Sequence, residues 1–176
     1  MIWVTPLSRL EETLRLTNAQ HVLSLLSVGS APVSSAELPS AQHLNLAMHD
    51  IAEPRDGFVA PSSDHVREIL DFASRWDRKK PLLIHCYAGI SRSTAAAYVI
   101  AAALQPERDE QDLASELRRL APSATPNPLI VAHADDLLGR NGRMRTAIGN
   151  IGRGAEAFEG MPFSLKIGRG LTSRDE

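Results

Sequence analysis

A short apolar run, a compact polar loop and a long alanine-rich run follow one another near the middle of this chain. Residues 81–84, Pro-Leu-Leu-Ile, are short and apolar and begin with proline, which predicts a buried β-strand. Residues 94–104 hold strong helix formers and no helix breaker, which predicts a buried helix. Residues 85–93 must therefore join the carboxyl end of a strand to the N-terminus of a helix. Backbone N–H groups point into such a junction and the helix dipole favours negative charge there, so this loop is suited to bind an anion.

The side chains of this loop add a nucleophile and a cation to the anion site. Cys86 is the single cysteine of the chain, and Arg92 follows it within the same loop. A helix N-terminus and a nearby cation lower a thiol pKa to roughly 3.5–7.5, so Cys86 is a candidate thiolate nucleophile. The planar guanidinium of Arg92 is suited to hold two oxygens of a phosphoryl group. Gly89 permits a tight turn, and the Ser93 hydroxyl is expected within reach of the sulfur. The loop therefore predicts a phosphate cradle with a nucleophile in its floor.

The string His-Cys-x-x-Gly-x-x-Arg-Ser at residues 85–93 resembles the signature of the cysteine-based protein tyrosine phosphatases. The flanking sequence is similar to that of their dual-specificity-like branch. The resemblance centres on residues 81–104 and extends more loosely over residues 40–140. It implies a phosphatase-type strand-loop-helix active site within an α/β fold.

The resemblance also implies a role for each residue of the motif. Cys86 would be the nucleophile, Arg92 the phosphate clamp and Ser93 the hydroxyl that helps to release the phosphoenzyme. His85 would support the cysteine from behind. The phosphate-binding backbone would comprise Tyr87, Ala88, Gly89, Ile90, Ser91 and Arg92.

A general acid is expected on the polar loop at residues 49–61, because a phosphatase must protonate its leaving oxygen. This loop follows a predicted strand, at the sheet edge where open α/β sheets place their sites. In the related phosphatases the acid is an aspartate on such a loop, at a slightly shorter spacing from the cysteine. We predict that Asp50, directly after the strand, is the acid. Asp56 is the alternative and Glu53 the next candidate, and the remaining possibility is that both aspartates merely cap turns.

Strands alternate with helices along the rest of the chain, which predicts an α/β fold with a central, mostly parallel sheet flanked by helices. Ser8 and Glu11 form a capping-box pattern that predicts the start of a helix. Asn127 followed by proline predicts another helix start, with a polar contact to substrate as the alternative role of Asn127. The third strand, at residues 44–48, is expected near the centre of the sheet. Further strands are expected at residues 2–4 and 21–28, and further helices at 62–76, 109–121 and 127–138.

The length and net charge of the chain limit the number of domains and the kinds of partner that we expect. A chain of 176 residues suits one phosphatase domain, 1–176, in which residues 139–176 form a C-terminal extension packed on the body. Alternation at residues 161–167 predicts a strand in that extension. A net charge of −2 gives no general attraction to nucleic acid or to an anionic membrane, and neither is expected as a partner.

A single cysteine excludes an internal disulfide and fits a reducing, cytoplasmic setting. No signal peptide is apparent, and the longest apolar run is too short to cross a bilayer. No metal-ligand spacing appears, and the expected chemistry needs neither a metal nor a cofactor.

These observations predict a hydrolase of phosphate monoesters that works through a cysteinyl-phosphate intermediate. The expected substrate is a phosphorylated protein, with phosphotyrosine first and dual specificity as an extension, or a small phosphoester. A phosphate or sulfate ion would also fit the loop. Family members that act on polyanionic lipid headgroups usually carry lysines in this loop, whereas Tyr87, Ala88 and Ile90 are uncharged.

Other functions remain open. An inositol phosphate or an RNA 5′-triphosphate is an alternative substrate. A rhodanese-type sulfurtransferase and a non-catalytic phosphate-binding module are alternative classes. Free cysteines are also commonly inert core residues, which is the structural alternative for Cys86.

Overall fold

The computed structural model describes residues 1–31, 33 and 42–168 and contains a five-stranded sheet in the order β3-β2-β4-β1-β5. Strands β3, β2, β4 and β1 run parallel, and β5 is antiparallel to β1. The predicted α/β class with a mostly parallel sheet is confirmed. The strands are β1 (Ile2–Pro6), β2 (His21–Leu26), β3 (His43–Ala47), β4 (Leu82–Cys86) and β5 (Phe163–Leu165).

The central position predicted for the third strand is wrong, because β3 lies at an edge and pairs only with β2 among the described residues. Its sequence alternates apolar and polar residues, and Asn45 and Ala47 are exposed. Strand β4, in contrast, is buried along its whole length and lies at the centre. A strand buried on both faces needs a continuous apolar run, whereas an alternating strand suits an edge.

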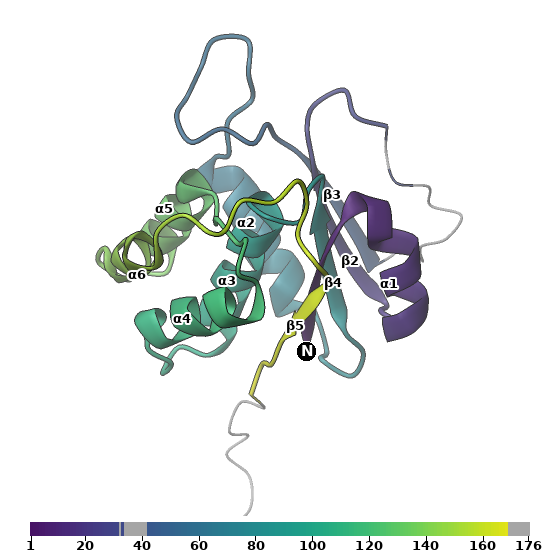
Figure 1. Cartoon of the computed structure of the whole chain (residues 1–176). Helices are drawn as coiled ribbons and strands as arrows, with labels where there is room; N and C mark the ends of the chain where they lie inside the picture. The colour runs from purple at the N-terminus through teal and green to yellow at the C-terminus, as the bar shows by residue number, and fades with distance from the viewer. Residues whose placement is uncertain (32, 34–41, 169–176) are drawn as a thin grey trace, which may run out of the picture.

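One helix covers one face of the sheet and a group of helices covers the other (Figure 1). Helix α1 (Leu10–Thr17), preceded by the 3₁₀ turn η1 (Leu7–Arg9), packs on Val22 and Leu83. The predicted capping box at Ser8 is wrong: Ser8 lies within η1 and its hydroxyl donates to Glu159 at 2.7 Å. The opposite group comprises α2 (Ser63–Ser74), α3 (Arg92–Leu104), α4 (Glu110–Leu120), α5 (Pro128–Leu137) and α6 (Arg143–Ile151).

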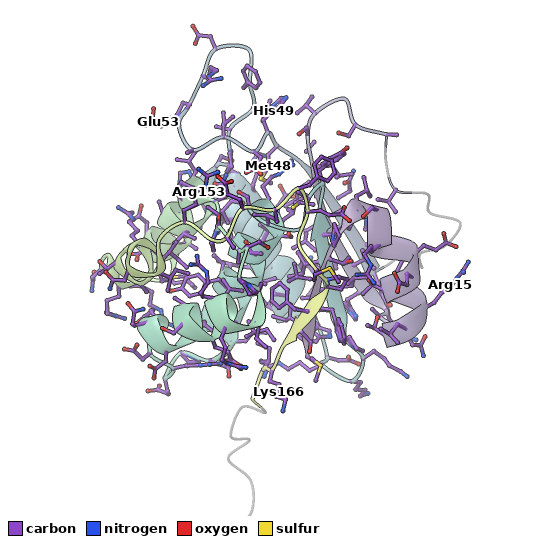
Figure 2. The ribbon with its side chains drawn as sticks, viewed as in Figure 1. Arg15, Met48, His49, Glu53, Arg153 and Lys166 are labelled. Atoms are coloured by element: carbon purple, nitrogen blue, oxygen red, sulfur yellow. The ribbon has the colours of Figure 1, made fainter. Side chains whose placement is uncertain are left out.

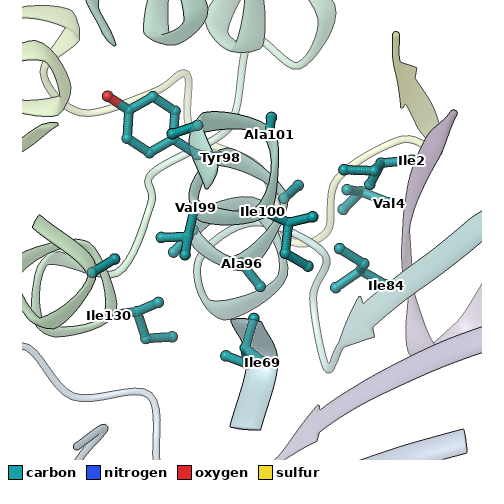
Figure 3. Close-up of a cluster of buried hydrophobic side chains, with 14 of the residues drawn as sticks. Ile2, Val4, Ile69, Ile84, Ala96, Tyr98, Val99, Ile100, Ala101 and Ile130 are labelled. Carbon is teal, nitrogen blue, oxygen red and sulfur yellow. The ribbon is translucent and has the colours of Figure 1, made fainter. Parts of the chain in front are cut away.

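Helix α3 occupies the centre of the main core and is buried from Arg92 to Ala102. Its alanines let the neighbouring elements approach closely, while Val99 and Ile100 fill the space between them. Figure 3 shows Ile69 of α2, Ile130 of α5 and the strand residues Ile2, Val4 and Ile84 around this helix. Close packing on all sides fixes the N-terminus of α3, where the candidate site begins.

Helix α6 was not expected from the sequence, because its residues include an internal glycine and no side chain caps it locally. The buried carboxylate of Asp135, on α5, accepts the N–H groups of Gly142, Met144 and Arg145 at 2.6 to 3.2 Å. A side chain from another helix thus satisfies the first orphan donors of α6.

A segment that we name the strap, residues 152–162, joins α6 to β5 and passes over the carboxyl end of the sheet (Figure 1). The guanidinium of Arg118 holds the start of the strap by donating to the carbonyls of Ile151 and Gly152, each at 2.8 Å. The strand predicted at residues 161–167 is confirmed over Phe163–Leu165, as β5. Among the described residues, no helix combines the length and apolarity that would let it cross a membrane.

Candidate active site

The loop between β4 and α3 is tightly closed against the end of β1. Gly89 has φ +69°, a conformation that L side chains rarely adopt, and a Cβ there would lie 2.7 Å from the backbone nitrogen of Pro6. Both the backbone angle and the lack of space therefore require glycine. The glycine that sequence reasoning assigned to a tight turn is placed in one.

The carbonyl groups of the loop are turned outward by hydrogen bonds from segments far away in the sequence. In a planar trans peptide the carbonyl and the following N–H point in opposite directions. The N–H groups that follow these carbonyls, on residues 88, 89, 91 and 92, therefore point toward the inside of the loop. The outward bonds run from Leu7 to Tyr87 at 2.9 Å, Gly160 to Ala88 at 2.8 Å, Thr125 to Ile90 at 3.0 Å and Asn127 to Ser91 at 3.3 Å.

Cys86 lies at the floor of this loop and is 1% exposed. Its Sγ accepts the N–H of Gly89 at 3.3 Å and is 3.1 Å from Oγ of Ser93. The thiol that sequence reasoning selected therefore accepts one backbone N–H and lies beside a serine hydroxyl, and in that second pair either atom could be the donor.

Arg92 is buried, and one end of its guanidinium is tied to the ends of β2 and β3. Its Nη1 donates to the carbonyl of Met48 at 2.7 Å and to Oγ of Ser27 at 3.3 Å. Its Nε is buried and has no hydrogen-bond partner among the described residues. A buried donor without a partner is costly, and an anion in the loop would supply one. Arg92 also borders a cavity of about 510 Å³, lined further by Leu7, Leu26, Ser27, Ser30, Ala31 and Tyr87.

Asp50 lies beside the loop and, of the three acidic candidates, is the one that hydrogen-bonds to it among the described residues. Oδ1 of Asp50 accepts the hydroxyl of Ser91 at 2.6 Å and the side-chain amide of Asn127 at 2.9 Å. Its Oδ2 is 3.7 Å from Nε of Arg92. Asp56 and Glu53 are exposed and form no hydrogen bond with residues 85–93 in the described part of the chain. Figure 2 shows Glu53, with His49, on the loop that rises beyond the sheet.

Asn127 has two functions in one side chain. As predicted, it caps α5, because its Oδ1 accepts the N–H groups of Leu129 and Ile130 at 3.0 and 3.2 Å. Its Nδ2 donates to Asp50 and, at 3.1 Å, to the carbonyl of Ile51. The amide that was considered for contact with substrate thus holds the loop that carries Asp50.

His85 is fully buried behind the cysteine, in contact with the backbone and with a serine. Its Nδ1 is 3.4 Å from the carbonyl oxygen of Cys86, and its Nε2 is 2.6 Å from Oγ of Ser24. That hydroxyl also lies 2.8 Å from Nε2 of His43. Burial, more than any other cause, lowers the pKa of His85 to about 4, so the ring is neutral near pH 7.

Several residues around the loop were missed from the sequence. Ser24 had one signal, a serine within the apolar part of strand β2. His43 stands at the start of β3, and nothing in its local sequence pattern links it to the loop. Gly160 and Thr125 act through their backbones, for which a sequence pattern gives no signal.

Neither a protein-family model nor a curated protein sequence matches this chain, but solved structures do. The structure of the Cydia pomonella PTP-2 phosphatase is 21% identical, with a TM-score of 0.60 over 77% of this chain and 84% of that chain. DUSP15 is 16% identical, with a TM-score of 0.59 over 85% of this chain and 89% of that chain. PTPMT1, solved in complex with PI(5)P, is 15% identical, with a TM-score of 0.60 over 80% and 91%.

Structural similarity at such low sequence identity shows that the backbones are arranged alike. It agrees with the position of the loop at residues 85–93, between a central strand and a buried helix. The chain therefore has the fold of the cysteine-based protein tyrosine phosphatases, in agreement with the resemblance seen in its sequence.

Proposed function

We propose that this chain is a phosphatase that hydrolyses phosphate monoesters through a covalent intermediate on Cys86. The observation that carries the proposal is the relation between the sulfur, the inward-facing N–H groups and the buried Nε of Arg92, which has no hydrogen-bond partner in the described part of the chain. A phosphoryl group placed in this loop meets a nucleophile below it and hydrogen-bond donors around its oxygens. Phosphoryl transfer depends mainly on positioning and charge stabilisation, and the loop supplies both.

In the first step, the Cys86 thiolate attacks phosphorus in line with the leaving oxygen. The sulfur–phosphorus bond forms as the phosphorus–oxygen bond breaks, while Arg92 and the loop amides hold the three equatorial oxygens. The leaving oxygen takes a proton from Asp50.

Asp50 suits this role because its two carboxylate oxygens differ in their contacts. Oδ1 accepts two donors, from Ser91 and Asn127, which fixes the orientation of the carboxyl group. Oδ2 remains available to carry a proton and faces the side on which Arg92 would hold the phosphate.

In the second step, water attacks the phosphocysteine and displaces the sulfur. The Asp50 carboxylate takes the proton of the attacking water, which returns the acid to its starting state. Ser93 Oγ, 3.1 Å from the sulfur, donates to the departing thiolate. The products are inorganic phosphate and the free enzyme.

Phosphotyrosine in a protein is the substrate that we favour, with phosphoserine and phosphothreonine as extensions. Among the described residues that line the 510 Å³ cavity, Arg92 alone carries a charge. One cation matches a single phosphate monoester, whereas a headgroup with several phosphates needs additional cations. Tyr87, 64% exposed at the rim, offers a ring surface to an aromatic leaving group.

We further propose that residues 1–176 form one phosphatase domain. Two contacts support this extent. Strand β5 completes the sheet beside β1, and the strap donates a hydrogen bond from Gly160 to the candidate phosphate loop.

Substrate class is tested by comparing kcat/KM for a phosphotyrosine peptide, a phosphoserine peptide and a short-chain phosphoinositide. The proposal expects the phosphotyrosine peptide to lead, and Cys86→Ser to abolish turnover of all three. A higher kcat/KM for the phosphoinositide would overturn the substrate assignment but would leave the proposed phosphatase activity standing. A thiosulfate–cyanide sulfurtransferase activity without phosphatase activity would overturn the function.

A further inference from the structure

Three polar side chains form a continuous row behind the candidate nucleophile, on the face of the sheet that α1 covers. His85 of β4 and Ser24 of β2 are both fully buried and are paired in the sheet register. Oγ of Ser24 is 2.6 Å from Nε2 of His85 and 2.8 Å from Nε2 of His43, on β3. One hydroxyl thus joins two imidazole rings across three strands.

The direction of each hydrogen bond follows from what each atom is able to donate. The carbonyl oxygen of Cys86 only accepts, so the proton of His85 that faces it belongs on Nδ1. A neutral His85 with Nδ1–H has a bare Nε2, which must accept the Ser24 hydroxyl proton. Since that hydroxyl has one proton, Ser24 accepts in turn from Nε2–H of His43. The row therefore runs from His43 through Ser24 and His85 to the backbone of Cys86.

We propose that Ser24 and His43 are positioning residues, which hold His85 in its Nδ1–H tautomer and thereby fix Cys86 under the phosphate loop. If Ser24 did not donate, the proton of His85 could move to Nε2, and a bare Nδ1 would face the Cys86 carbonyl. That repulsion would shift the backbone that places the sulfur 3.3 Å from the N–H of Gly89. The weaker hydrogen bond would leave the sulfur less reactive.

The row keeps its direction whether or not His43 is charged. Burial lowers the pKa of His43 below 6.5, and protonation occupies its Nδ1 while Nε2–H remains. The charges that act on His85 come from His43 and from Arg92 on α3, and both disfavour a second proton on its ring. On the α1 side, the neighbouring polar groups of Thr5 and Thr13 bond to each other at 3.0 Å and carry no charge.

The tautomers are tested directly by two-bond ¹H–¹⁵N correlation spectra of the histidine rings at pH 7. The proposal expects the Nδ1–H form for His85 and the Nε2–H form for His43. An Nε2–H tautomer of His85 would overturn it. Neither observation requires the protein to turn over a substrate, although the role of the row in catalysis rests on the proposed function.

The effect on the nucleophile is tested by the rate at which iodoacetamide alkylates Cys86 across a pH series. Loss of one neutral hydrogen bond should slow alkylation at pH 7 by about fivefold in Ser24→Ala and in His43→Leu. His43→Gln places an amide N–H donor near the position of Nε2 and should restore a rate close to wild type. Asn45→Ala, at an exposed position two residues along β3, is the matched control and should leave the rate unchanged.

Rescue by the glutamine separates the proposed role from a general effect on packing, because leucine fills the site and glutamine restores the donor. Equal rates in wild type, Ser24→Ala and His43→Leu would overturn the proposal. Slow alkylation by the glutamine variant would also overturn it. If alkylation follows the expected order while no phosphomonoester is turned over by the wild type, the proposed function fails and the positioning row stands.

Discussion

Gly160→Ala tests whether the strap is part of the phosphate loop. A Cβ at this position would lie 2.8 Å from the carbonyl oxygen of Gly89, whereas ordinary contacts of a Cβ begin at 3.4 Å. The strap and the loop must therefore separate by about 0.6 Å, and a misplacement near 1 Å costs on the order of 10² in rate. We expect kcat/KM toward p-nitrophenyl phosphate to fall by about tenfold to a hundredfold.

The separation would also weaken the 2.8 Å hydrogen bond from the Gly160 N–H to Ala88, which turns that carbonyl out of the cradle. Binding of inorganic phosphate, measured by titration calorimetry, should weaken together with the rate. The thermal midpoint should also fall, because the atom that the Cβ meets belongs to the backbone and must move with the loop. The start of the strap keeps its anchor at Arg118, so the fold itself should be retained.

Gly149→Ala is the matched control. Gly149 lies within α6, and an added Cβ there meets nothing within 4 Å. Alanine is also the better helix former by about 1 kcal/mol, so this variant should be slightly more stable and equally active. Wild-type activity and phosphate affinity in Gly160→Ala, with a correctly folded protein, would refute the coupling of strap and loop.

Three further predictions concern the site itself. Asp50→Asn should slow hydrolysis of phosphotyrosine by about 10²–10⁴-fold, and it should slow hydrolysis of an ester with a highly acidic phenol much less. Asp56→Asn should leave both steady-state rates near wild type. If Asp56→Asn instead shows the loss that depends on the leaving group, Asp56 rather than Asp50 is the general acid. Arg92→Lys should weaken phosphate binding and lower kcat/KM severely, since an ammonium lacks the planar fork, and near-normal kinetics would remove Arg92 from the clamp. The contribution of His85 to the unfolding free energy should fall by about 2.5 kcal/mol as the pH falls from 6.5 to 4, because unfolded His85 takes up a proton that the folded ring refuses until its pKa of about 4. His85→Gln should remove that part of the slope in urea titrations, and an unchanged slope would contradict the assignment.

The site was predictable where its parts are close in the sequence. A strand, a loop and a helix that follow one another place Cys86 and Arg92 in one turn of chain, so the local pattern suffices. The position of Asp50 beside the loop was predictable, because parallel strands end at a common edge, and β3 and β4 both do so. Asn127 was predictable as a cap, because the N-cap and the following proline form a local signal.

The remainder depends on tertiary contacts that local patterns do not encode. The edge position of β3 follows from the order of strands in space; its alternation is compatible with an edge but does not by itself assign one. Helix α6 depends on Asp135 from another helix, and the outward turn of the loop carbonyls depends on backbone groups of Leu7, Thr125 and Gly160. Residues that act through their backbones carry no side-chain signature.

The covalent intermediate is the central claim, and rapid quenching followed by peptide mass spectrometry tests it most directly. The enzyme is mixed with excess aryl phosphate, quenched in acid within the first turnover, and digested. We expect one phosphoryl group on the peptide that contains Cys86, carried by the sulfur, and none in Cys86→Ser. Turnover without phosphocysteine, or a phosphoryl group on another residue, would contradict the proposed mechanism.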